Sequence, residues 1–201
     1  YFDIKSEKLD TAEFRHNIKE AVHKVAKNKN KTALFLSGGM DSTIVASLLR
    51  DSDVDIEVFT MGYNLSQKGF HWGHKEHAYE AEMAVKTAQD WGYKVHRITL
   101  DRDDRAHFGK MWLANTHYMW SDQNRQAPRY LLCQKAAEAG CKVVLTGDSG
   151  DELFTGYNHH KKRFEEGECE NMTKFFTTQR WFPYKAFGND YMSNTLFADL
   201  L

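Results

Sequence analysis

The stretch from 32 to 49 constrains the fold most, because it joins a short apolar run to a glycine-rich turn and then to a helical pattern. The run at 32–36, TALFL, predicts a buried strand. The loop SGGMDS at 37–42 follows directly, and apolar residues then recur at helical spacing. A glycine turn between a strand and a helix start lets the backbone approach a polyphosphate and offers it free N–H groups. We therefore predict phosphate binding at this loop.

Strands and helices alternate along the rest of the chain. Further strands are expected at 56–60, 94–98 and 142–146, and helices at 14–25, 75–91, 105–120 and 126–139. This order predicts an α/β fold with a parallel sheet flanked by helices on both faces. Ligands of such sheets bind beyond the carboxyl ends of the strands. Since no linker or repeat divides the sequence, we expect a single domain over residues 1–201.

Charge and cysteine content restrict the compartment and the partners. The 27 basic and 28 acidic side chains give a net charge of −1, which disfavours nucleic-acid binding because that usually needs a clustered basic face. The three cysteines form no CxxC pair, which favours a reducing compartment. No apolar run reaches the length of a membrane span. We expect a cytoplasmic protein with no membrane and no nucleic-acid partner.

A second glycine-rich loop follows the strand expected at 142–146. It carries the carboxylates Asp148, Asp151 and Glu152 beside a glycine turn and a helix start. An acidic helix cap would explain one or two of them. Three close together favour a metal ion or acid–base chemistry. In the first loop, Asp41 would repel phosphate by itself, so it fits a magnesium ion that is bound to that phosphate.

The two loops carry a family resemblance. SGGMDS at 37–42 is similar to SGGxDS, the signature of the PP-loop ATP pyrophosphatases, which have the adenine nucleotide alpha hydrolase-like fold. VLTGDSGDELFTGY at 144–157 resembles S/T-G-E-G-x-D-E-L/I-F-G-G-Y of the asparagine synthetases. The resemblance covers a core at 32–157 and implies the synthetase domain of a glutamine-hydrolysing asparagine synthetase, possessing no glutaminase domain and truncated at its C-terminus.

That resemblance implies an AMP-forming amide ligase with ATP and Mg2+ as cofactors. The enzyme would activate a carboxylate, aspartate or a related acid, as an acyl-adenylate for attack by ammonia or an amine. The implied nucleotide-site residues are Phe35, Ser37, Gly38, Gly39, Asp41, Ser42, Met61, Thr146 and Gly147. Asp41 and Asp151 would bind magnesium, and Asp148 would act as general base in place of the family's glutamate.

Several alternatives stay open at this stage. The family's late lysine has no clear counterpart and Asp148 replaces the family's glutamate, so a nucleotide-binding module without turnover is one of them. A tRNA-modifying PP-loop enzyme is another. The chain begins with Tyr1 rather than the glutaminase cysteine. A separate glutaminase subunit and a homo-oligomer are open as partners. The histidines of HWGHKEH at 71–77 are expected in a loop that leads into the next helix rather than in a zinc site.

Overall fold

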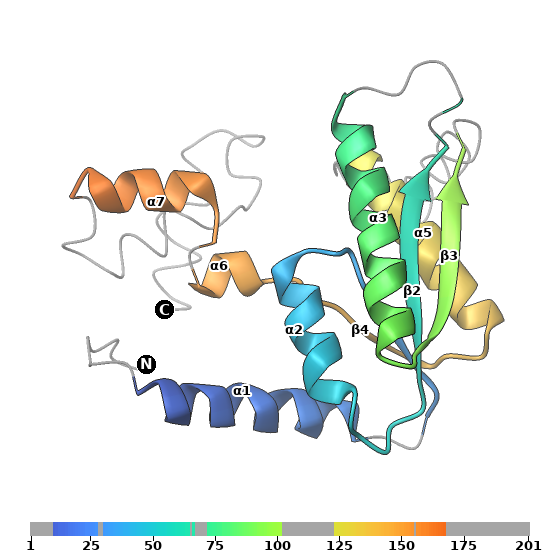
Figure 1. Ribbon diagram of the computed structural model, residues 1–201, viewed down its shortest axis with the longest axis horizontal. Helices are drawn as coiled ribbons and strands as arrows, with labels where there is room; N and C mark the ends of the chain where they lie inside the picture. Colours follow the sequence, from blue (N-terminus) through green and yellow to red (C-terminus); the bar gives the residue numbers. More distant parts are fainter. Residues whose placement is uncertain are drawn as a thin grey trace, which may run out of the picture. The chain divides into compact units, whose positions relative to one another are not determined.

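The computed structural model describes residues 10–27, 30–64, 66, 72–101, 123–154 and 156–167. These residues fall into two compact units, which are described separately below. The larger unit covers the chain from Thr11 to Asp148, and the smaller one comprises Asp10 and the described residues from Ser149 on. Figure 1 shows both.

The larger unit is built on a four-stranded parallel sheet with the strand order β3-β2-β1-β4. Its strands are β1 (Thr32–Phe35), β2 (Ile56–Tyr63), β3 (Lys94–Leu100) and β4 (Val143–Leu145). Leu34 at the centre of β1 is in register with Val58 on one side and Leu145 on the other. The expected strand at 56–60 therefore continues to Tyr63, because β2 pairs with β3 along that whole stretch.

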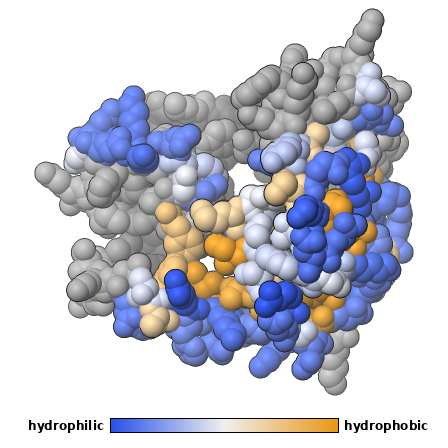
Figure 2. Space-filling view, viewed as in Figure 1, coloured by the Kyte–Doolittle hydropathy of each residue, from blue (hydrophilic) through white to orange (hydrophobic). Residues whose placement is uncertain are grey.

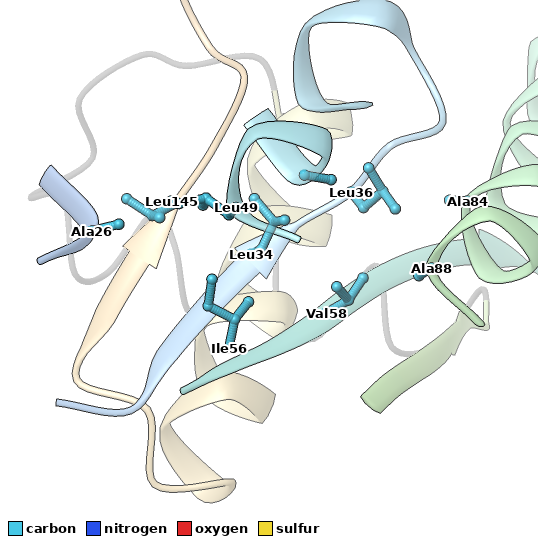
Figure 3. Packing of buried hydrophobic residues seen from close by; sticks show 10 residues of the cluster. Ala26, Leu34, Leu36, Leu49, Ile56, Val58, Ala84, Ala88 and Leu145 are labelled. Atoms are coloured by element: carbon cyan, nitrogen blue, oxygen red, sulfur yellow. The ribbon is translucent and has the colours of Figure 1, made fainter. Parts of the chain in front are cut away.

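Helices cover both faces of this sheet, as the sequence predicts. They are α1 (Thr11–Ala26), α2 (Met40–Leu49), α3 (Trp72–Asp90) and α5 (Gln123–Glu138). On one face, Leu34 and Val58 pack with Leu49 of α2 and Ala84 of α3 (Figure 3). On the other face, apolar residues of β1 and β2 pack against Ala136 of α5. The continuous burial of β1 follows from this two-sided cover.

Two local expectations differ from the structure. Helix α3 begins at Trp72, before the expected start of the helix at 75–91, so the expectation of a loop leading into that helix is wrong for residues 72–74. Val25, the last of the apolar residues that recur at helical spacing in the helix expected at 14–25, is 62% exposed, whereas Ala26 is fully buried. Helix α1 reaches the core cluster mainly through its last turn, so these apolar residues are only partly covered. The helix expected at 105–120 lies outside the described residues.

The smaller unit contains the helices α6 (Gly150–Phe154) and α7 (Asn158–Glu165). Helix α7 is strongly polar and forms the lysine–glutamate pairs Lys161–Glu165 and Lys162–Glu166 at i, i+4 spacing. Figure 2 shows it as a hydrophilic patch. Within the described ranges, none of the helices has the length and apolar character needed to cross a membrane.

Candidate active site

The SGGMDS loop occupies the predicted position between the end of β1 and the start of α2. Gly38 has a φ of +89°, and a β-carbon there would overlap the backbone carbonyl oxygen of Glu80 in α3. Both the backbone angle and the lack of space require glycine. The loop is therefore seated directly against α3.

Hydroxyl groups fix the shape of the loop. The buried Ser42 Oγ accepts the N–H of Ser37 at 3.2 Å and lies 3.0 Å from Ser37 Oγ. Ser42 and Thr43 both donate to the carbonyl oxygen of Gly39, at 3.2 and 2.8 Å. Gly39 precedes α2 and supplies no side-chain hydrogen bond to its first turn. A helix start that no side chain caps is suited to an anion.

The second loop meets the first turn of α2. A β-carbon on Gly147 would lie 2.5 Å from the backbone nitrogen of Ser42 and 2.9 Å from the carbonyl carbon of Asp41. This approach follows from the pairing of β1 with β4, which brings the ends of the two strands side by side. The structure thus brings together Asp41, Ser42 and Gly147, as expected for two loops at one sheet edge.

Asp148 has a cationic partner that the sequence does not reveal. Arg129 Nη2 donates to Asp148 Oδ1 at 2.8 Å, and each side chain is about half exposed. The backbone N–H of Asp148 donates to Thr146 Oγ1 at 3.4 Å. Arg129 lies on α5, in the segment APRYLL, where only a helix start was expected. An arginine beside a helix start carries no specific signal of its own, so this contact emerges only from the fold.

The two residues expected to contact adenosine differ in exposure. Phe35 is only 9% exposed and packs edge-to-face with Phe59, with the ring centroids 6.4 Å apart. Little of its surface remains for a ligand. Met61 is half-buried on β2, in register with Ile98. Adenosine packing at these two positions stays a prediction.

The turn after Asp148 is conformationally restricted. Ser149 has a φ of +72°, in the left-handed region that glycine favours, and the asparagine synthetase signature has glycine at this position. Further along the chain, a β-carbon on Gly156 would overlap Asp151 Oδ1. The backbone N–H of Gly156 also donates to the carbonyl oxygen of Asp151 at 3.0 Å. Gly156 therefore packs closely on the carboxylate of Asp151.

The carboxylates fit a magnesium ion only together with phosphate. Asp41 is half-buried in the first turn of α2, and Asp151 is half-buried in α6. Over the described part of the chain, no three His, Cys, Asp or Glu residues are grouped as a metal site would require. Magnesium usually binds one or two carboxylates and completes its shell with water and substrate phosphates. Asp41, within the loop that is predicted to bind phosphate, meets that requirement.

Known proteins resemble this chain over most of its length. The family model of asparagine synthase matches residues 13–197. Amidase chyE of Penicillium rubens is 27% identical over 161 residues, covering 78% of this chain and 24% of that protein. The putative glutamine-hydrolysing asparagine synthetase 1 of Methanocaldococcus jannaschii is 25% identical over 158 residues, covering 78% and 27%. This chain therefore spans about a quarter of the length of these relatives.

Solved structures are similar at a lower level, among them the NH3-dependent NAD synthetase from Campylobacter jejuni, with a TM-score of 0.46 and 19% sequence identity. The alignment covers 75% of this chain and 62% of that one.

Proposed function

Because this chain belongs to the asparagine synthase family, we propose that it acts as an AMP-forming amide ligase that activates a carboxylate with ATP. The observation that carries the proposal is the contact of Gly147 with the first turn of α2 at Ser42. This contact joins the loop at 37–42 to the acidic loop after β4. ATP binding requires the loop at 37–42, and the ligase reaction also requires Asp148, the residue that follows Gly147.

The loop at 37–42 would bind the departing pyrophosphate. Its shape is fixed in advance by the hydroxyl contacts of Ser42, so little reorganisation is needed when the phosphate charge develops. The start of α2 directs its dipole at the same charge. Asp41 would bind the magnesium ion, which neutralises phosphate charge when bound, and the family resemblance predicts Asp151 as a further magnesium ligand.

The reaction itself has two steps. An oxygen of the substrate carboxylate bonds to the α phosphorus of ATP, and pyrophosphate leaves with the bonding electrons. Ammonia or an amine then bonds to the acyl carbon, and AMP leaves with its oxygen. Asp148, which lies at the carboxyl end of β4, would accept the proton that the amine nitrogen loses. The acid is aspartate or a related acid, and a separate glutaminase subunit could supply the ammonia.

The test is product analysis. The purified protein is incubated with ATP, magnesium and ammonium, with aspartate and related acids added one at a time. We expect AMP and pyrophosphate in equal amounts, dependent on one of the acids. Release of ADP and phosphate would contradict the proposal. ATP binding without pyrophosphate release for any acid would indicate a binding module instead.

A further inference from the structure

Arg129 and Asp148 form an ion pair between two separate elements at the candidate site. The helix α5 that carries Arg129 is held against the sheet by the buried residues Leu131 and Ala136. Pro128 precedes Arg129 within the helix and restricts the backbone there. The guanidinium therefore extends from a fixed base to the loop after β4, where Nη2 lies 2.8 Å from Asp148 Oδ1.

Stability does not account for this pair. Ion pairs between half-exposed side chains contribute little to folding, because solvent screens the charges and the side chains lose entropy. The same helix carries an ordinary surface ion pair, in which Lys135 Nζ lies 2.7 Å from Glu138 Oε2 at i, i+3 spacing. That pair joins neighbours on one helix, whereas Arg129 joins α5 to a loop that also contacts the start of α2 through Gly147.

The chemistry of the site explains what such a contact could do. Asp148 is one methylene shorter than the glutamate of the asparagine synthetase signature, so its reach toward a reacting amine is reduced. A general base works only within hydrogen-bond distance of the proton it removes, and small displacements lower the rate strongly. A guanidinium that holds one oxygen restricts both torsions of the aspartate side chain, since its donors have a fixed planar geometry.

We propose that Arg129 is a positioning residue that orients the carboxylate of Asp148 for proton transfer. This inference rests on the proposed function, in which Asp148 is the base. It predicts a particular kinetic pattern, because Arg129 would act on the chemical step and not on ATP binding.

The experiment compares Arg129→Gln, Arg129→Lys and the matched control Lys135→Gln, which breaks an exposed pair on the same helix. For amide formation we expect Arg129→Gln to lower kcat at least about tenfold with KM for ATP unchanged, and Arg129→Lys to restore part of the loss. Lys135→Gln should match the wild type. Unchanged kcat in Arg129→Gln, or a rise in KM for ATP alone, would overturn the proposal.

A second measurement is independent of turnover. Side-chain scalar couplings of Asp148, measured by NMR in the wild-type protein, should report one χ1 rotamer, and those of Arg129→Gln should report averaging. Averaged couplings already present in the wild type would overturn the positioning role even if the enzyme is active. A protein that releases no pyrophosphate but shows one rotamer, lost in Arg129→Gln, would contradict the proposed function and leave the positioning effect supported.

Discussion

Gly147 approaches the first turn of α2 so closely that a β-carbon on it would stand 2.5 Å from the backbone nitrogen of Ser42. Real β-carbons do not approach a backbone atom this closely, so the loop after β4 and the loop after β1 fit together only with glycine at 147. The geometry of the loop at 37–42, which is predicted to bind phosphate, and that of the acidic loop are therefore coupled. Several experiments test how far that coupling controls nucleotide binding.

Substitution of Gly147 is the first. Gly147→Ala must displace either the loop or the start of α2, so we expect ATP affinity to fall at least about tenfold, which corresponds to roughly 1.4 kcal/mol. Calorimetric titration with ATP measures it. Gly140→Ala is the control, because Gly140 has a φ of +86° but open space around it. It should lower stability by about 1–2 kcal/mol and leave ATP affinity unchanged.

The two glycines of the first loop differ both in the space available for a β-carbon and in the backbone φ angle. Gly38→Ala places a β-carbon on the carbonyl oxygen of Glu80 at a positive φ, whereas Gly39→Ala meets only Ser37 Oγ at 3.3 Å with a φ of −75°. We expect Gly38→Ala to abolish measurable ATP binding and to lower the thermal midpoint of unfolding by several degrees. Gly39→Ala should leave that midpoint nearly unchanged. Equal effects of the two substitutions would contradict the close seating of the loop against α3.

The hydroxyl of Ser42 stabilises the loop through hydrogen bonds with Ser37 and Gly39. Ser42→Ala removes its contacts with Ser37 and Gly39, so we expect a loss of about 1 kcal/mol in the free energy of unfolding and weaker ATP binding. Ser47→Ala is the matched control, since Ser47 is exposed on the same helix and donates only to the carbonyl oxygen of Ile44. Denaturant titration and calorimetry of both variants give the comparison. A Ser42→Ala protein that binds ATP like the wild type would show that the hydrogen bonds of Ser42 are not needed for ATP binding.

The fold was predictable where the signal was local. The uninterrupted apolar run at 32–36 and the glycine loop after it specify a buried strand, a turn and a helix within a few residues. The strand order and the contact of Gly147 with Ser42 depend on pairing between distant segments, which periodicity does not encode. The partner of Asp148 was not predictable for the same reason, since the position of Arg129 depends on how α5 lies on the sheet.

Glu57 illustrates the same limit in the core. On sequence alone it is a charged residue near the start of the IEVFT strand, yet its side chain is only 7% exposed. Three basic side chains surround its carboxylate, one from just before β1 and two from β3: Lys31 Nζ at 2.7 Å, Lys94 Nζ at 2.8 Å and His96 Nε2 at 2.5 Å. The His96 ring also stacks on Phe59, with the ring centroids 4.4 Å apart.

This cluster predicts an acid-dependent loss of stability. Burial by itself would raise the pKa of Glu57, but hydrogen bonds from Lys31, Lys94 and His96 outweigh it and lower the pKa to about 2. The pKa of the folded state is thus below the unfolded value of about 4.3, so the stabilisation is complete above that value and is lost as the pH falls toward 2. Denaturant titrations at a series of pH values from 7 to 2 should show this decline.

Glu57→Gln provides the comparison for that measurement. It should lower the free energy of unfolding at pH 7 by roughly 1–3 kcal/mol, because a buried amide accepts hydrogen bonds from the two lysine ammonium groups less well than a carboxylate does. It should also flatten the decline below pH 4.3. Glu138→Gln is the control, since Glu138 is exposed and paired only on its own helix. Parallel pH profiles for Glu57→Gln and the wild type would show that another group causes the acid transition.

The most direct measurement follows the oxygen of the substrate carboxylate. The protein is incubated with ATP, magnesium, ammonium and the active acid labelled with 18O in the carboxyl group that becomes the amide, and the AMP is analysed by mass spectrometry. If the carboxylate attacks the α phosphorus, one labelled oxygen stays with the phosphoryl group when AMP leaves, so we predict AMP that contains 18O. AMP that forms without the label would contradict an acyl-adenylate and with it the central claim.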